Sequence, residues 1–267
     1  MSISALWIDG APATVEDLMR QALVNYGAYT SFAVAGGAVR GLDRHLARLT
    51  HAGHALFGAA VPESRVRDLI LQALGDRSDA FVRVSLFSRE ISPRSPAHEE
   101  PPSVMVGVFH PATPLGEAPL RLQPQPYSRE MPDLKHVATM GLIRARRRAR
   151  LAGYDDALFV DAEGRISEGS LWNIGFMRGD TVTWPDAPML QGVSQALIKA
   201  HLADFGLKQE TRRVTLDDLS GFDGAFITNS ATPACSVAAI GDHAFSLSTE
   251  RLASVTAAWA RAEPQPV

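Results

Sequence analysis

Cysteine, lysine and long apolar runs are all scarce in this sequence of 267 residues, and each shortage excludes a class of protein. The single cysteine, Cys235, cannot form a disulfide within the chain and fits a reducing compartment. No apolar run approaches the length needed to span a membrane. The first residues also lack the basic segment and long apolar core of a signal peptide. We therefore expect a cytoplasmic protein with no membrane association.

A strong net charge is absent as well. The formal net charge of -3 argues against general nucleic-acid binding. The eight histidines are scattered without metal-ligand spacing, so we expect no metal site. Five arginines between residues 144 and 150 lie opposite a stripe of small apolar residues. We interpret them as a solvated helix face rather than a nucleic-acid patch.

Lysine is the most informative shortage, because only Lys135, Lys199 and Lys208 occur among 26 basic residues. Arginine cannot form a Schiff base, since its guanidinium is never a free amine at ordinary pH. Most single lysines are solvated surface charges. Lys199 falls in an ordinary helix pattern and Lys208 in a charged strand. Lys135 instead stands between Pro132 and a helical pattern, and this setting makes it the candidate for covalent chemistry.

The residues that follow Lys135 contain a second candidate. After the helical pattern, two short strands are predicted at Ala157–Val160 and Arg165–Glu168, with a turn between them. The second strand carries Glu168 and leads to Asn173. We interpret this block as one that holds a cofactor with a ring. The lysine would form a Schiff base with the cofactor, and the carboxylate would contact the far end of its ring.

Hairpins and helices are mixed along the chain. Alternation over Tyr29–Val34, followed by Gly36-Gly37 and Ala38–Arg40, predicts a β-hairpin. From Leu42 to Leu56 the apolar residues recur at helical spacing, with Arg44, His45 and Arg48 off the apolar stripe. Because strands and helices do not strictly alternate, we predict an α+β (mixed α/β) fold rather than a doubly wound sheet.

The sequence divides into two halves. We predict a smaller α/β domain over residues 1–112 and a larger cofactor-binding domain over residues 119–267. Residues 111–118 are the predicted link between them. Residues 88–102 are rich in Pro, Ser and charge and are predicted to form a mobile loop.

Two segments of the second half are suited to anions. Gly192-Val193-Ser194 leads into a predicted helix, and the free N–H groups of a helix N-terminus attract phosphate. Residues 228–232 supply hydroxyls and small residues in a second turn. Each segment alone is typical of a helix cap or a tight turn. Together with an isolated lysine and a carboxylate strand, they favour a cofactor that bears a phosphate.

These residues, in this order, resemble a known family. Arg48, Lys135, Glu168 with Asn173, Leu190-Gln-Gly192 and Thr228-Asn-Ser230 are similar to the class IV (fold type IV) pyridoxal-phosphate enzymes. That family includes branched-chain and D-amino acid aminotransferases, (R)-amine transaminases and aminodeoxychorismate lyase. The resemblance extends from Tyr29 to Ile240 and is strongest over residues 153–161 and 164–173. His45-Leu-Ala-Arg-Leu49 also matches the family pattern His-x-x-Arg-Leu.

The resemblance implies a two-domain architecture with pyridoxal 5'-phosphate between the domains. Lys135 would hold the cofactor as a Schiff base and then move the substrate's proton. Glu168 would keep the pyridine nitrogen protonated, which makes the ring an electron sink. The family's other cofactor contacts would come from Arg48 at the phosphate, with Asn173, Gly192, Val193, Ser194, Asn229 and Ser230. The substrate side would be lined by Tyr29, Thr30, Arg83, Ala231 and Thr232, with Arg83 near a substrate carboxylate.

The chain departs from the family pattern at three places. Residues 25–32 lack an acidic residue that many of these aminotransferases have, and Gln191 replaces the proline of Leu-Pro-Gly. Thr139-Met140 replaces an Asn-Tyr pair, which argues against branched-chain specificity. Lys135-His136 and Thr228-Asn229 are closer to the lyase branch.

The expected activity is therefore transfer of an amino group between an amino acid or amine and a 2-oxo acid, by a homodimer. The alternative is 4-amino-4-deoxychorismate lyase, which eliminates pyruvate and leaves 4-aminobenzoate. A third possibility is a pyridoxal-phosphate-binding protein without turnover. Retention of both Lys135 and Glu168 counts against this last alternative, because a bare scaffold needs neither.

Overall fold

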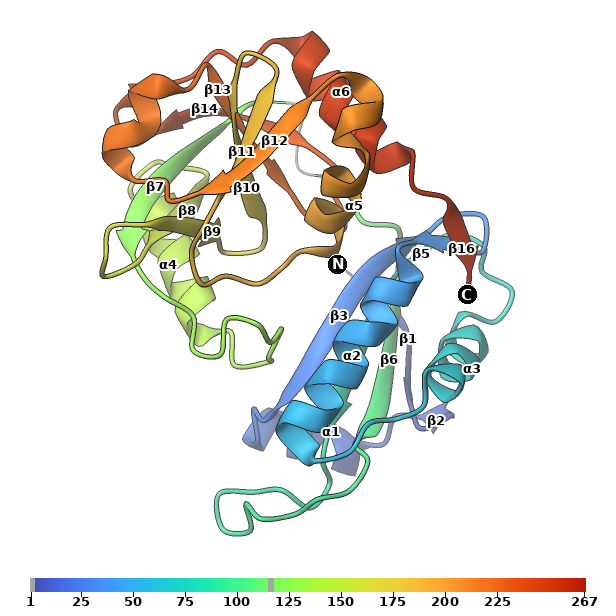
Figure 1. The fold of residues 1–267 in the computed structure, drawn as a ribbon. Helices are drawn as coiled ribbons and strands as arrows, with labels where there is room; N and C mark the ends of the chain where they lie inside the picture. Colours follow the sequence, from blue (N-terminus) through green and yellow to red (C-terminus); the bar gives the residue numbers. More distant parts are fainter. Residues whose placement is uncertain (1–2, 115–117) are drawn as a thin grey trace. The chain divides into compact units, whose positions relative to one another are not determined.

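The computed structural model describes residues 3–114 and 118–267, which fall into two compact units (Figure 1). Unit 1 contains the chain up to Ala112, Leu134–Ala138 and Pro264–Val267; unit 2 contains Thr113–Asp133 and Thr139–Glu263. Residues 115–117 of the predicted link lie outside the described residues, as do residues 1–2 of the predicted smaller domain. Unit 1 thus takes in two short segments from later in the chain, and one of them carries Lys135.

Unit 1 is built on a five-stranded antiparallel sheet in the order β2-β1-β6-β5-β3. Its strands are β1 (Ile3–Ile8), β2 (Ala11–Pro12), β3 (Gly27–Val34), β5 (Ala80–Phe87) and β6 (Ser103–Phe109). Helices α2 (Leu42–Phe57) and α3 (Glu63–Leu74) pack on one face of this sheet, while the short helix α1 (Val15–Leu23) buries no residue (Figure 1).

Alternation along the strands decides which residues reach the helices of unit 1. On β5, Val82 and Val84 are fully buried in the core shared with α2 and α3. They pair with Phe32 and Thr30 of β3, so those two side chains share the same face. The intervening residues of both strands face the other way, and they include Tyr29 and Arg83.

The predicted hairpin at Tyr29–Arg40 forms its turn but not its ladder. Gly36 and Gly37 both have positive φ, as a tight hairpin turn requires. Past the single bridge Ala35↔Ala38, strand β4 (Ala38–Arg40) pairs instead with β16 (Pro264–Pro266). The sequence did not predict β16, because two prolines in three residues argue against a strand.

Unit 2 contains a nine-stranded mixed sheet in the order β12-β11-β10-β13-β14-β7-β8-β9, with β15 beside β14. Its strands are β7 (Leu120–Pro126), β8 (Asp156–Val160), β9 (Ile166–Gly169), β10 (Asn173–Arg178), β11 (Thr181–Pro185), β12 (Lys208–Arg212), β13 (Gly224–Thr228), β14 (Cys235–Ile240) and β15 (His243–Ala244). A further pairing of β9 with β10 closes six strands into a ring, and the two residues that close it are Glu168 and Asn173.

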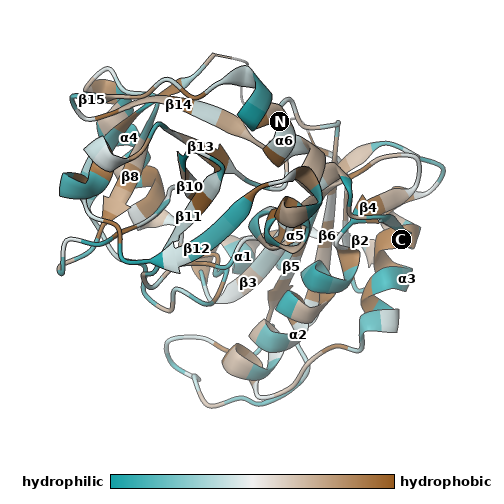
Figure 2. Cartoon of the chain, turned by 45° about the horizontal axis from the view of Figure 1, so that its top comes forward, coloured by the Kyte–Doolittle hydropathy of each residue, from teal (hydrophilic) through white to brown (hydrophobic). Residues whose placement is uncertain are grey.

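Helices cover parts of this second sheet. They are α4 (Met140–Leu151), α5 (Val193–His201) and α6 (Thr249–Ala260), with the 3₁₀ helices η1 (Leu202–Phe205) and η2 (Leu216–Gly221). Strand β12 lies at the edge of the sheet and is hydrophilic and exposed, as edge strands that avoid further pairing are (Figure 2). Parallel and antiparallel pairings occur together, which confirms the predicted α+β class.

Helix α4 confirms the interpretation of the arginine cluster. Its buried residues are Leu142, Ala145 and Ala149, which pack on Ala157 and Phe159 of β8. The apolar spacing predicts a stripe that extends from Ala138 to Ala152, but both of these residues lie outside the helix. Four of the five arginines are exposed, and the fifth, Arg146, is half-buried.

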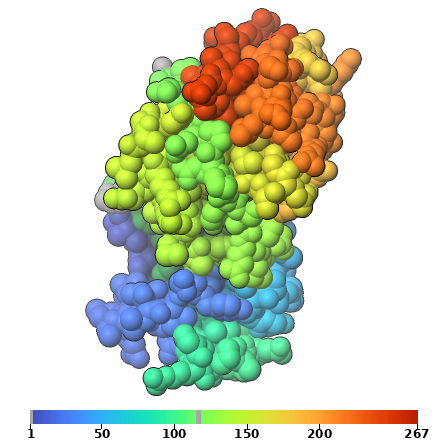
Figure 3. Space-filling view, turned by 90° about the vertical axis from the view of Figure 1, so that its left-hand side faces the viewer, coloured from blue at the N-terminus to red at the C-terminus, as the bar shows by residue number. Residues whose placement is uncertain are grey.

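Residues 88–102 form a loop beside the end of α1, drawn teal beside blue in Figure 3. Arg89 fixes the start of this loop by ion pairs with Asp9 at 2.7 Å and Asp17 at 2.9 Å. The rest of the loop contains one isolated bridge, Ser92↔Ser95. Its mobility stays a prediction.

The core of unit 1 offers a matched pair of substitutions on α3. Ile70 is fully buried, whereas its neighbour Leu71 is 49% exposed. We expect Ile70→Ala to lower the free energy of unfolding by about 2–5 kcal/mol, because it leaves a cavity. Leu71→Ala should change it by less than about 0.5 kcal/mol. Urea denaturation of the two variants measures the difference, and equal losses would contradict the core described here.

Candidate active site

Lys135 belongs to a short extended segment at the edge of the sheet in unit 1. The carbonyl of Lys135 accepts a hydrogen bond from the N–H of Tyr29 at 2.8 Å, and Val137 donates to Gly27 at 2.9 Å. Leu134 is buried in a small cluster with Ala28 and other residues of the unit. The segment therefore continues the sheet beyond β3, and backbone bonds on both sides of Lys135 fix its position.

The aromatic ring of Tyr29 lies close to two cations. The Nζ atom of Lys135 is 5.0 Å from the ring centroid, and the Cζ atom of Arg83 is 3.6 Å from it. Arg83 also donates from Nε to the hydroxyl of Ser85 at 3.3 Å. Burial lowers the pKa of Arg83 from its ordinary value, yet an arginine stays charged at any pH of interest. The structure thus brings together three of the predicted residues, Tyr29, Arg83 and Lys135.

Thr30 and His45 depart from their predicted places. The Thr30 hydroxyl is fully buried on the helix side of the sheet and forms a 2.6 Å hydrogen bond with Nδ1 of His45. Its side chain therefore faces away from Tyr29, and we remove Thr30 from the residues predicted to line the substrate side. His45 was predicted off the apolar stripe but is buried against Phe32. The hydrogen bond to Thr30 is what allows a polar ring there.

The positive charge of Arg48 affects the pKa of His45. Burial of the His45 imidazole, and next the positive charges of Arg48 and Lys135, hold the pKa of His45 well below its ordinary value of 6.5. His45 is therefore neutral at physiological pH. Arg48 itself is half-buried, three residues further along α2. The predicted phosphate ligand and the predicted Schiff-base lysine thus lie close enough to share one electrostatic environment in unit 1.

In unit 2, a buried carboxylate and a buried amide are joined through one backbone residue. Glu168 and Asn173 are each only 4% exposed. The N–H of Leu190 donates to Oε1 of Glu168 at 3.2 Å, and the carbonyl of Leu190 accepts from Nδ2 of Asn173 at 2.8 Å. The two predicted cofactor residues are therefore fixed to each other and to the segment that enters α5.

Gly192 stands at the N-cap of α5, next to that link. A Cβ atom on this residue would collide with Oδ1 of Asn173, although the φ of -67° suits any residue. The first backbone N–H groups of a helix have no partner within the helix, so those of Val193 and Ser194 are available to an anion. Glycine is needed here because the chain passes so close to Asn173.

Two polar side chains near this helix end are buried without partners. Among the described residues, the amide of Gln195 and the hydroxyl of Thr228 have no hydrogen-bond partner, although they are 1% and 0% exposed. Thr228 lies directly opposite Asn173 in the β10–β13 ladder. Because buried polar groups are normally satisfied, these atoms fit a site that receives a polar ligand such as a phosphate.

The turn after β13 completes the group in unit 2. Oδ1 of Asn229 accepts from the N–H groups of Ala231 at 2.9 Å and Thr232 at 2.8 Å, so this side chain shapes the turn. The hydroxyl of Ser194 donates to the carbonyl of Asn229 at 2.9 Å and ties the turn to α5. Ser230 and Ala231 are half-buried, whereas Thr232 is buried.

The sequence analysis missed two charged residues that support this group. Arg129 lies 3.6 Å from Glu168, and both side chains are 5% exposed. Asp156 is buried and accepts from the hydroxyl of Ser170 at 2.8 Å and from Nε1 of Trp172 at 3.0 Å, with Arg146 3.6 Å away. Asp156 thus holds the loop between Glu168 and Asn173. No local pattern marks Arg129, but Asp156 lies within the strongest block of the resemblance.

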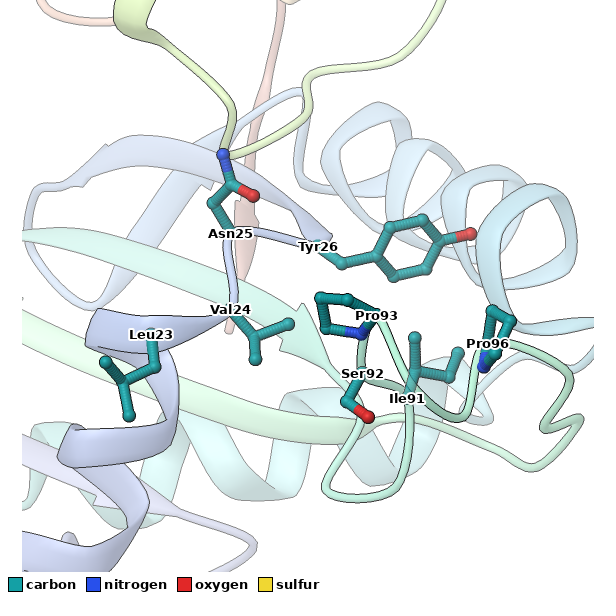
Figure 4. Close-up of a pocket in the computed structure, with 8 residues that line it drawn as sticks. All are labelled: Leu23, Val24, Asn25, Tyr26, Ile91, Ser92, Pro93 and Pro96. Carbon is teal, nitrogen blue, oxygen red and sulfur yellow. The ribbon is translucent and has the colours of Figure 1, made fainter.

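A depression of about 310 Å³ elsewhere in unit 1 contains none of the predicted residues (Figure 4). Its lining is largely apolar, and its one titratable group, Tyr26, donates to the carbonyl of Leu56 at 2.8 Å.

Among the described residues, no cluster of three or more His, Cys, Asp or Glu side chains could hold a metal ion. No described helix has the length and apolar character to cross a membrane.

Comparison with known proteins gives a family match over most of the chain. Residues 27–240 match the family model described as amino-transferase class IV. A probable branched-chain-amino-acid aminotransferase of Rickettsia felis is 27% identical over 208 residues, which cover 73% of this chain and 71% of the relative.

Solved structures share the fold. A branched-chain amino acid aminotransferase of T.th., solved with pyridoxamine 5'-phosphate, matches with a TM-score of 0.83 at 20% identity, covering 97% of this chain and 93% of the other. The 4-amino-4-deoxychorismate lyase of Pseudomonas aeruginosa matches with a TM-score of 0.77 at 22% identity, covering 92% of this chain and 95% of the other. Aminotransferases and a lyase therefore share this architecture.

The close approach at Gly192 can be tested by adding one methyl group. We expect Gly192→Ala to destabilise the protein by about 1–3 kcal/mol, because the new Cβ must displace Asn173 or the start of α5. Binding of pyridoxal phosphate should weaken as well. Gly221→Ala is the matched control, since no atom lies within 4 Å of its Cβ position. Thermal unfolding and a cofactor titration measure both effects, and equal behaviour of the two variants would refute the role given to Gly192.

The buried imidazole of His45 predicts a specific pH dependence. Its pKa is lowered in the folded state, so the unfolded chain binds more protons below about pH 6.5. The stability contributed by a neutral His45 is therefore present above that pH and is lost as the pH falls, by up to about 1.4 kcal/mol per pH unit. Urea unfolding of wild type and His45→Gln between neutral and acidic pH tests this.

The slope of stability against pH should be smaller in His45→Gln than in wild type over this range. Arg44→Gln, an exposed change on the same helix, should keep the wild-type slope. An unchanged slope in His45→Gln would show that His45 is not the group that titrates.

Proposed function

Since the chain belongs to the amino-transferase class IV family and is a pyridoxal-phosphate-dependent aminotransferase, we propose that the residues described in each unit contribute to binding and using pyridoxal phosphate. Lys135 is the proposed catalytic residue. It lies in the group of unit 1 with Arg48, Tyr29 and Arg83. Glu168 and the N-terminus of α5 lie in the group of unit 2.

The observation that carries this proposal is the link through Leu190. One backbone residue joins a buried carboxylate to the segment that begins α5, and Gly192 starts that helix two residues later. A ring nitrogen needs a carboxylate, and a phosphate ester needs the N–H groups of a helix end. A short segment of unit 2 offers both, as a cofactor with a basic nitrogen and a phosphate requires.

When bound, pyridoxal phosphate supplies an electron sink that accepts negative charge from the substrate carbon. Glu168 would hold the proton at the ring nitrogen, and Asn173 keeps Leu190 and hence Glu168 in place. The N–H groups of Val193 and Ser194 would bind the phosphate, and Gly192 lets the chain pass close to Asn173. Asn229 shapes the turn that presents Ser230 and closes against Ser194.

In unit 1, Arg48 would contribute positive charge toward the phosphate. Lys135 would hold the cofactor through its amine and would carry the proton at the substrate carbon. The ring of Tyr29 limits where the Lys135 amine can go, because Nζ rests 5.0 Å from its centroid.

Arg83 is the residue we assign to the substrate. Its guanidinium lies over the ring of Tyr29, and a planar guanidinium binds carboxylates through two parallel hydrogen bonds. Arg83 supports an amino acid, rather than a simple amine, as the amino donor, and a 2-oxo acid as the acceptor. Ala231 and Thr232 remain proposed residues of the substrate side.

The domain and assembly assignments are proposals too. We assign residues 1–112 to a smaller domain and 119–267 to a larger cofactor-binding domain.

A homodimer is supported by exposed apolar side chains on α1 and α4, such as Met19 at 60% and Met140 at 79% exposure. The single cysteine, Cys235, supports a cytoplasmic location. Light scattering on the purified protein tests the homodimer, because it measures whether the mass in solution is that of one chain or of two.

The lyase reaction is the second candidate. Lys135-His136 and Thr228-Asn229 resemble the lyase branch, and the Pseudomonas aeruginosa lyase shares the fold. Both reactions begin by removing the same proton. They differ in what leaves next, so the released product distinguishes them.

The absorbance spectrum of the purified protein with pyridoxal phosphate is the first test. We expect a yellow protein whose colour survives gel filtration, and we expect Lys135→Ala to lose the covalent link. Borohydride reduction followed by mass spectrometry should find the cofactor on Lys135. Lys208→Ala, which removes an exposed lysine at the sheet edge, should behave like wild type. A covalent link that persists in Lys135→Ala would refute the assignment.

The same spectrum then identifies the substrate class. Amino donors that serve the enzyme should bleach the yellow band, and a 2-oxo acid should restore it. Pyruvate released from aminodeoxychorismate without an acceptor would instead establish the lyase reaction. A wild-type protein that never takes up the cofactor would contradict both.

A further inference from the structure

Arg129 forms a buried ion pair with Glu168 that the proposed function does not use. Nε of Arg129 lies 3.6 Å from Oε1 of Glu168, and each side chain is only 5% exposed. Arg129 lies beyond the end of β7, six residues before Lys135 in the sequence, and within unit 2. Oε1 of Glu168 also accepts the N–H of Leu190 at 3.2 Å.

Burial makes the charge of Glu168 depend on such contacts. A carboxylate removed from water takes up a proton unless an opposite charge or hydrogen-bond donors favour its ionised form. Arginine is suited to this task because it cannot lose its own proton. A buried pair is costly to form and gives little net stability, which makes a purely structural purpose a weak explanation.

Several other charged groups around β9 have ion-pair partners of their own. On β8, Asp156 pairs with Arg146, and at the start of β9, Arg165 pairs with Asp161 at 2.7 Å. On β10, the neighbour of Glu168 is the neutral Asn173, and Arg178 lies at the exposed far end of that strand. Arg129 is thus the cation that the described ion pairs place at Glu168.

We propose that Arg129 is a positioning residue that keeps Glu168 ionised, so that Glu168 can hold the proton of the cofactor's ring nitrogen. This inference rests on the proposed function of Glu168. Arg129 does not touch the reacting atoms; it acts through the carboxylate. A neutral Glu168 could no longer stabilise a protonated ring, and the cofactor would lose both affinity and its capacity to accept charge.

The proposal has a directional consequence for pH. Without Arg129, a buried Glu168 loses the opposite charge that favours its ionised form, so more of the population carries a proton on this carboxyl group at a given pH. Affinity for pyridoxal phosphate should therefore fall, and should recover as the pH is raised and Glu168 ionises. A purely structural defect would not recover with pH.

The experiment is a double-mutant cycle of wild type, Arg129→Gln, Glu168→Gln and the double variant. The readouts are the dissociation constant of pyridoxal phosphate, obtained by titration at several pH values, and the pH dependence of the bound cofactor's absorption. Arg129→Lys keeps the charge and should restore much of the affinity. Arg165→Gln, which breaks an ion pair at the other end of β9, should bind the cofactor like wild type.

We expect Arg129→Gln to weaken binding in the wild-type background and to add little in the Glu168→Gln background. Equal losses in both backgrounds, or a loss independent of pH and not rescued by lysine, would overturn the role of Arg129 alone. Wild-type affinity and spectrum in Glu168→Gln would instead overturn the proposed function of Glu168. Thermal unfolding of each variant verifies that it is folded before its binding is compared.

Discussion

The backbone of Leu190 is the connection on which the rest of the site in unit 2 depends. Its N–H holds Glu168 and its carbonyl holds Asn173, and both side chains come from strands that meet at the closure of the ring. The segment that contains Leu190 then leads to Gly192, the N-cap of α5. A carboxylate, an amide and a helix N-terminus are thus placed by one residue whose own side chain takes no part. Any change that moves this segment moves all three together.

Much of this site could be read from the sequence because its residues are close together along the chain. Glu168 and Asn173 flank a short loop, Gly192 precedes an apolar helix pattern, and Lys135 is nearly the only amine available. Residues that act through contacts distant in sequence could not be predicted, because no local pattern marks them. Arg129 meets Glu168 across 39 positions, and His45 is buried only because Thr30 on another strand supplies its hydrogen bond.

The same distinction explains the errors in the fold. Alternation correctly predicted β3, but a sequence pattern cannot say which strand a neighbour will pair with, and β4 pairs with β16 instead. The face on which Thr30 lies also follows from its register with Val84 rather than from its own type. Elements and candidate residues that are local in sequence were therefore predictable, whereas pairing partners and faces were decided by the whole unit.

The recruitment of Leu134–Ala138 and Pro264–Val267 into unit 1 bears on how the protein is made. Ribosomes release the chain from its N-terminus, and domains that are continuous in sequence can fold as they emerge. Unit 1 cannot do so completely, because the edge of its sheet is completed by the segment that carries Lys135, and β4 pairs with β16. Unit 1 can therefore be completed only after both later segments have been synthesised, and until then β3 and β4 have unpaired edges.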